Sequence, residues 1–135
     1  MKKHYQIEQY PIGDCFRACI SSILCKDDIN EVPNFMKDGE CNFDDNFDTW
    51  KAKNEYQYIE VSFKEWESQH FIPDSICVVV IKNNAHPHGH AIVGKSYKKD
   101  RKRYLGLLFN PQKGYNLDNI KSNDILSIGF LSKEI

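Results

Sequence analysis

The chain has 135 residues, the size of one domain with a moderate core, so we expect a single domain over residues 1–135. Apolar residues make up 41% of the sequence and charged residues 27%, which is typical of a globular protein. The net charge of -1 argues against nucleic acid and against an acidic membrane surface as partners.

Membrane and export signals are missing from the sequence. The longest apolar run, residues 76–81, is far shorter than the ~20 residues that a membrane-spanning helix needs. No apolar stretch follows the N-terminal lysines, so we expect no signal peptide and a cytoplasmic location. The 5 cysteines are odd in number and have no CxxC spacing, which favours free thiols over a disulfide framework.

The first predicted element follows a Gly-Asp-Cys sequence within "YPIGDCFRACISSIL", residues 10–24. From Phe16 onward the apolar residues fall three and four apart, which predicts a helix with one buried face. Cys15 would be its first residue and Asp14 its N-cap, with Gly13 allowing the turn before it. Unpaired N–H groups and the helix dipole favour a thiolate there. We therefore predict that the pKa of Cys15 is lower than those of the other cysteines.

A short helical turn is expected to be capped by Asp27 or Asp28 and to stop before Pro33. A second amphipathic helix is predicted over residues 43–56, where three aromatic residues have helical spacing. This region is acidic, which indicates either a solvated surface or a surface for a basic partner. Its acidic residues are Asp38, Glu40, Asp44, Asp45 and Asp48.

The second half of the chain has alternating or β-branched segments that predict strands. They cover residues 56–63, 75–82, 90–97, 103–109 and 126–131. Because helices precede strands, we expect an α+β fold, with the N-terminal helix that carries the cysteine packed on a C-terminal antiparallel β-sheet.

The basic run at residues 98–103 lies between two of these strands and is interpreted as an exposed hairpin tip. With the tip near Asp100, residues whose numbers sum to about 200 would face each other. Three such pairs are Gly94 with Gly106, Ile92 with Leu108, and His90 with Asn110. The hairpin would thus bring an imidazole and an amide together at its open end, where Pro111 ends the second strand.

A cysteine nucleophile needs a base within reach, and the base needs a third group that holds its ring. Cys15, His90 and Asn110 can supply these three roles. The oxyanion of an acyl-transfer intermediate also needs hydrogen-bond donors. The backbone N–H of Cys15 can be one donor, and the side-chain amide of Gln9, six residues earlier, can be another; Gln6 is a nearby alternative.

The order of these motifs resembles the papain-like cysteine peptidase superfamily. The motifs are Gln9, then Gly-Asp-Cys-Phe at residues 13–16, then Gly-His-Ala-Ile-Val-Gly at residues 89–94, then Asn-Pro at residues 110–111. The small size and the Asn-Pro resemble the bacterial double-glycine leader peptidases most, although those usually carry Asp-Pro. Unlike papain, the chain has Ile12 before the glycine and Phe16 after the cysteine, and its middle, residues 27–69, is short.

The resemblance implies a papain-like fold and a role for each motif residue. Cys15 would attack, His90 would exchange the proton, Asn110 would orient His90, and Gln9 would help to form the oxyanion hole. We therefore expect a cysteine peptidase-like hydrolase that cleaves a peptide, isopeptide or related amide bond in a protein or peptide substrate. Alternatives are glutamine deamidation, acyl transfer to an amine, or a non-catalytic binding or inhibitor protein that keeps the fold.

Other interpretations of the same residues, without a catalytic role, stay open. Cys15 can be a structural thiol, and Asn110 can cap a turn before the proline. The alternating histidines of "HPHGH", His86, His88 and His90, can ligate zinc, nickel or copper. No fourth ligand is evident beside them, so we expect no metal and no other cofactor.

Overall fold

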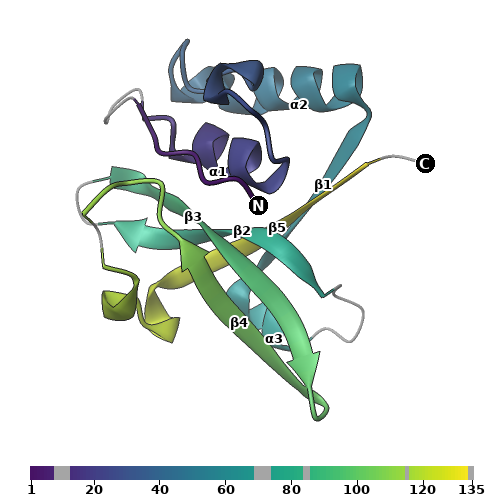
Figure 1. Cartoon of the computed structure of the whole chain (residues 1–135), viewed down its shortest axis with the longest axis vertical. Helices are drawn as coiled ribbons and strands as arrows, with labels where there is room; N and C mark the ends of the chain where they lie inside the picture. The colour runs from purple at the N-terminus through teal and green to yellow at the C-terminus, as the bar shows by residue number, and fades with distance from the viewer. Residues whose placement is uncertain (8–12, 69–73, 84–85, 115, 134–135) are drawn as a thin grey trace.

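A computed structural model describes residues 1–7, 13–68, 74–83, 86–114 and 116–133. Three helices precede or interrupt five strands that form one antiparallel sheet, in the order β1-β5-β2-β3-β4 (Figure 1). The α+β prediction is therefore confirmed. The helices are α1 (Cys15–Ile23), α2 (Phe43–Asn54) and α3 (Phe63–Ser68). The strands are β1 (Tyr56–Ser62), β2 (Ser75–Asn83), β3 (His86–Lys99), β4 (Lys102–Phe109) and β5 (Ile125–Lys133).

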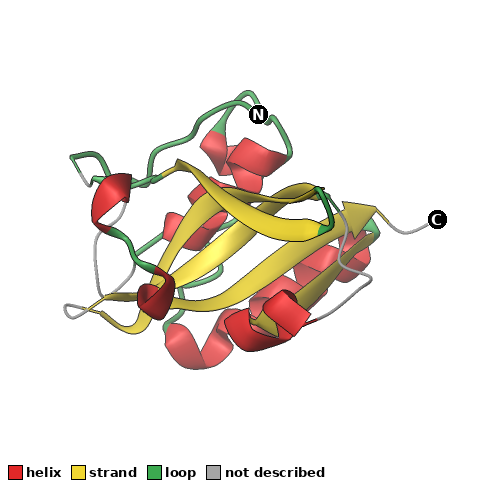
Figure 2. Cartoon of the chain, turned by 90° about the horizontal axis from the view of Figure 1, so that it is seen from below, coloured by secondary structure: helices red, strands yellow, loops and turns green. Residues whose placement is uncertain are grey.

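The sheet is covered on both faces, as the alternation of side chains along β2 shows. Val78 faces a core cluster formed with α1 and α2, whereas Cys77 and Val79 face a second cluster formed with Trp66 of α3. Helical segments accordingly lie against the strands from different sides (Figure 2). In the part of the chain that the structure describes, no helix has the length and apolar character needed to cross a membrane.

Helix α1 is enclosed more completely than an amphipathic pattern predicts. Six consecutive residues, 17–22, are buried, including Ser21 and Ser22. The N-terminal segment runs beside the helix (Figure 1), where the backbone N–H of His4 donates to Ser22 Oγ at 2.8 Å. On another side Ser21 Oγ donates to the carbonyl of Ile29 at 3.4 Å. These contacts hold the C-terminal end of α1 within the molecule.

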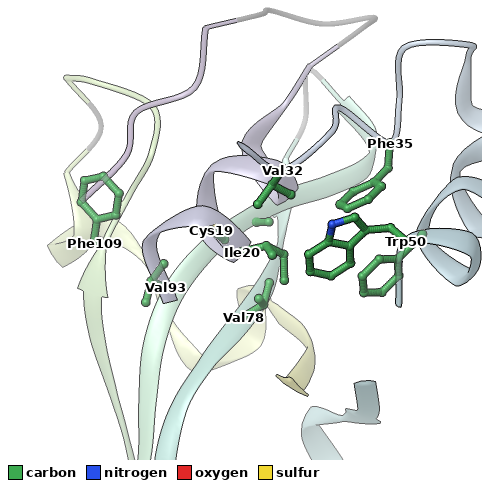
Figure 3. Packing of buried hydrophobic residues seen from close by; sticks show 10 residues of the cluster. Cys19, Ile20, Val32, Phe35, Trp50, Val78, Val93 and Phe109 are labelled. Carbon is green, nitrogen blue, oxygen red and sulfur yellow. The ribbon is translucent and has the colours of Figure 1, made fainter. Parts of the chain in front are cut away.

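Aromatic rings fill the space between α1, α2 and the sheet. Phe16 of α1 packs edge-on against Phe43 and Phe47 of α2, with ring centroids 5.2 and 5.0 Å apart. Figure 3 shows Trp50 beside Phe35 in the same cluster. The predicted second helix is thus present, and the aromatic contacts hold its N-terminal end close to Phe16, the residue after Cys15.

Helix α3 replaces the end of the first predicted strand. Ser62 and Glu65 cap each other: Glu65 N–H donates to Ser62 Oγ, and Ser62 N–H donates to Glu65 Oε1, both at 3.1 Å. This capping box ends β1 at Ser62 rather than at residue 63. The helix then buries Trp66, whose indole N–H donates to Ser96 Oγ at 2.9 Å.

The β3–β4 hairpin has a register that differs from the prediction. Its turn is centred between Asp100 and Arg101, which both have positive φ, 53° and 68°. Gly94 therefore pairs with Leu107, not with Gly106, and an irregularity shifts the pairing again beyond that point. The predicted opposition of Ile92 and Leu108 fails for the same reason, because the ladder ends with Val93 opposite Phe109.

Candidate active site

A cavity of about 310 Å³ lies where α1, the start of α2 and the sheet meet. Its lining includes both the predicted nucleophile, Cys15, and the predicted base, His90. The remaining lining residues are Gly13, Phe16, Met36, Phe43, Asp44, Glu60, Val80, Gly89 and Ala91. Residues 75 positions apart in the sequence thus share one hollow of the surface.

Cys15 is placed by the contact of α1 with β3. It is the first residue of the helix, and the backbone N–H of Ala91 donates to its sulfur at 3.5 Å. Because Ala91 directly follows His90 on β3, this contact locates the sulfur beside the strand that carries the imidazole. All cysteines of the chain are free thiols, as the sequence predicted.

The pKa of the Cys15 thiol is raised, so the predicted lowering is wrong. Burial is the main cause, and the neighbouring Asp14 carboxylate raises the pKa further. The backbone N–H groups of Ala91, Phe16 and Cys15 lower the pKa but do not outweigh burial. The resting sulfur is therefore a thiol, and forming the thiolate requires a base.

Asp14 occupies the N-cap position of α1, but its carboxylate does not cap the helix as predicted. It accepts the backbone N–H of Ile7 at 2.9 Å and pairs with Arg17 Nη2 at 2.6 Å. Both side chains of this ion pair are buried. The guanidinium of Arg17 thus compensates the charge of Asp14 one helical turn into α1, next to the nucleophile.

Asn110 fixes the orientation and the tautomer of His90. Its Oδ1 lies 2.8 Å from His90 Nε2 and accepts the backbone N–H of Gln112, also at 2.8 Å. Because a backbone N–H can only donate, this atom of Asn110 must be the oxygen, and His90 Nε2 must carry a proton. In neutral His90 the lone pair that accepts a proton is therefore on Nδ1. The hairpin does bring these two side chains together, although its register differs from the prediction.

Two parts of the sequence-based site cannot be placed in the structure. Gln9 lies outside the described residues, so its role in the oxyanion hole stays a prediction. The side chains of His86 and His88 also lie outside the described part. Among the described residues, no group of three or more His, Cys, Asp or Glu side chains is arranged to hold a metal ion. Gln6 is described, and its backbone N–H donates to the carbonyl of Pro111 at 2.9 Å.

Sequence reasoning missed several residues that shape the site. Glu60 lines the cavity from β1, and no motif marks it. Asp44 lines the cavity from α2, and the sequence marked it only as one residue of an acidic region. Gly89 has a φ of +81°, which its place beside a histidine in "HPHGH" does not reveal. Arg17 was detectable in principle, because an acid and a base three residues apart on a helix form a common ion pair.

Comparisons with models of protein families, with curated proteins and with solved structures find no match to this chain. The resemblance to papain-like peptidases therefore depends on the residues named above and on their arrangement.

Proposed function

We propose that this chain is a papain-like thiol hydrolase that cleaves a peptide, isopeptide or related amide bond through an acyl-enzyme on Cys15. One observation carries the proposal. Cys15 and His90 line the same cavity, and His90 is held by Asn110 in the tautomer whose Nδ1 can take a proton. A structural thiol and a turn-capping asparagine would not need this shared arrangement.

The raised pKa of Cys15 decides how the first step proceeds. A preformed thiolate is disfavoured, so His90 Nδ1 removes the thiol proton as the sulfur attacks the substrate carbonyl carbon. Imidazolium then gives this proton to the leaving amine as the C–N bond breaks, which leaves a thioester on Cys15. Asn110 Oδ1 accepts from the protonated ring through Nε2–H and so stabilises the cation that forms.

Hydrolysis of the thioester uses the same groups in reverse. His90 takes a proton from water, the resulting hydroxide oxygen attacks the thioester carbon, and the proton goes to the departing sulfur. The N–H of Ala91 already donates to that sulfur and stabilises the negative charge that develops on it as the C–S bond breaks, before the proton arrives. The backbone N–H of Cys15, at the start of α1, is aligned with the helix dipole and can donate to the oxyanion in both steps.

Acylation by a small activated ester tests the proposal without knowledge of the natural substrate. With p-nitrophenyl acetate we expect a stoichiometric burst of nitrophenol and an acetyl group on Cys15, located by mass spectrometry. Cys15→Ala should abolish the burst, and His90→Ala should slow it by on the order of 10²-fold or more. Circular dichroism would show that each variant is folded.

Cys25→Ala is the matched control, because Cys25 is an exposed thiol away from the cavity. This variant should keep the full burst on Cys15. Acetylation of Cys25 with no reaction at Cys15 would overturn the proposal. A peptide library digested with the wild type and with Cys15→Ala would then identify the bond, since hydrolysis gives a new carboxyl end and deamidation only converts glutamine to glutamate.

A further inference from the structure

The cavity beside Cys15 combines apolar walls with two carboxylates. Phe16, Phe43 and Val80 contribute apolar surface, and Met36 lies with them. Asp44 and Glu60 are also in the lining, and the described lining residues include no lysine or arginine. The cavity therefore has a fixed negative charge next to hydrophobic walls.

The two carboxylates come from elements that are distant from each other in sequence order. Asp44 is in the first turn of α2, whereas Glu60 is in the middle of β1. Glu60 is held in place, because Ser127 Oγ of β5 donates to its Oε1 at 2.8 Å. The fold therefore brings these two carboxylates to the same cavity, and they are not part of one acidic stretch of sequence.

The neighbouring acidic residues of α2 do not place their charge at the cavity. Asp45 also lies in the first turn of the helix, yet it is not part of the cavity lining. Asp48 pairs with Lys51 at 3.0 Å, so its charge is compensated on the helix surface. The charge that faces the cavity therefore comes from Asp44 and Glu60.

A basic side chain has the chemistry that fits this lining. Lysine and arginine carry an apolar stem of three or four methylenes and a cationic head, so one side chain can use both parts of the cavity. The stem can pack on Phe16 and Phe43, whose ring faces also attract cations. The head can then lie near Asp44 and Glu60. An acidic side chain would meet repulsion at the same place.

We propose that this cavity selects a lysine or arginine of the substrate next to the bond that Cys15 attacks. The inference depends on the proposed function for the identity of the substrate as a peptide. The charge selection itself can be measured through the chemical reactivity of Cys15, which needs no catalysis.

Charged thiol reagents of one chemistry provide the test. In a Cys25→Ser/Cys41→Ser background, Cys15 is the one thiol that is not fully buried. Its modification rate would be measured with three methanethiosulfonates that carry a trimethylammonium, a sulfonate or a neutral methyl group. The neutral reagent corrects for changes in thiol reactivity. A free exposed thiol in solution gives the intrinsic ratio of the charged reagents.

We expect the cationic reagent to be favoured over the anionic one by about threefold to tenfold beyond the intrinsic ratio at low ionic strength. Asp44→Asn/Glu60→Gln should remove most of this preference, and 0.5 M salt should weaken it. Asp45→Asn is the matched control, since it removes a charge from the same helix turn without changing the cavity lining. An unchanged preference in the double variant, or an equal loss in Asp45→Asn, would overturn the proposal.

Protection by amino-acid amides tests the stem and the head together. N-acetyl-lysine amide should slow modification by the neutral reagent more than N-acetyl-norleucine amide, which has a similar stem without the charge. Equal protection by the two would show that the cation is not recognised. If the ester burst at Cys15 fails while the charge preference holds, the hydrolase proposal is wrong, but the proposal that the cavity binds a basic side chain is retained. If the burst occurs without the charge preference, only the proposed lysine or arginine selection is rejected.

Discussion

The side-chain oxygen of Asn110 accepts two hydrogen bonds, from His90 Nε2 and from the backbone of Gln112. This double role explains why the residue type matters at this position. An aspartate retains oxygens that can accept both bonds, whereas an alanine accepts neither. Asn110 is a positioning residue in this view, because it acts on the substrate only through His90.

Substitutions of Asn110 should therefore distinguish an effect on the orientation of the His90 ring from an effect on packing and stability. We expect Asn110→Ala to lower the acylation rate by about 10- to 100-fold, less than His90→Ala, because the imidazole stays but can rotate. Asn110→Asp should keep most of the rate. Its negative charge also stabilises imidazolium, so the acidic limb of the pH–rate profile should move to higher pH. Stopped-flow acylation between pH 5 and 9 measures both effects.

A purely structural Asn110 would give a different result. The two variants would then change the rate only as much as they change stability, and the acidic limb would stay in place for both. Urea unfolding of each variant provides that comparison. Gln6, whose backbone also contacts this region through Pro111, serves as a side-chain control, and Gln6→Ala should change the rate little.

The sequence could predict that Cys15 and His90 lie near each other and that His90 contacts Asn110, because Cys15 begins a helix and the β3–β4 hairpin brings the other two residues together. It could not predict the pKa of Cys15. Helix-end effects are visible in a sequence, but burial depends on how β3 packs over the start of α1. The partner of Asp14 was mistaken for a similar reason, since the buried Arg17 competes with the helix N–H groups for the same carboxylate.

At the scale of elements, Gly89 determines where β3 places the side chain of His90. Gly89 has a φ of +81°, and a Cβ there would lie 2.6 Å from the carbonyl oxygen of Ile81 and 3.1 Å from Val80 Cγ1. The pairing of β2 with β3 is irregular just beyond Ile81. Close contact of the two backbones at Gly89 thus precedes the residue that carries the base.

Gly89→Ala should lower both stability and the acylation rate. Gly114→Ala is the matched control, because Gly114 has a φ of +82° but no atom within 4 Å of its Cβ position. The control should lose about 1–2 kcal/mol, the cost of a side chain at positive φ. Gly89→Ala should lose more and should also displace His90. Equal losses of stability, with acylation intact, would contradict this role; urea unfolding and the ester burst provide the two measurements.

The strands were predictable because β-branched runs and alternation persist over several residues, as in β2. Helix α3 was not, because six residues make fewer than two turns and show no clear periodicity. The Ser62–Glu65 capping box was its one readable signal. The hairpin register depended on which two residues adopt positive φ, and the basic run at its tip contains no glycine to mark them.

At the scale of the whole molecule, ionisable groups are buried on both faces of the sheet. Burial raises the pKa of Cys77 to about 12, and it raises the pKa of Cys19 and of Tyr58 well above their usual values. Cys77 belongs to the cluster beneath α3, whereas Cys19 and Tyr58 lie in the cluster beneath α1 and α2. A negative charge in either cluster would be removed from water and surrounded mainly by apolar side chains, which is unfavourable.

These groups should make the fold sensitive to alkali. Because the folded-state pKa of Cys77 exceeds that of the unfolded chain, folding favours the protonated thiol. The resulting stability is complete below the unfolded pKa, about 8.5, and is lost as the pH rises towards 12. Cys77 should thereby lower the free energy of unfolding by up to about 1.4 kcal/mol per pH unit within that window. Urea unfolding at pH 8, 9, 10 and 11 measures the slope.

Cys77→Ala should reduce the slope of the free energy of unfolding against pH by the contribution of this one thiol. The smaller side chain also lowers stability, but by the same amount at every pH, so it does not affect the slope. Cys25→Ala, at an exposed thiol, should leave the slope unchanged. Cys19 and Tyr58 are present in both variants, so some loss of stability at alkaline pH is still expected. If Cys77→Ala shows the same slope as the wild type, folding does not raise the pKa of Cys77. The alkaline loss would then have to arise beneath α1 and α2, on the face of the sheet that also supports Cys15.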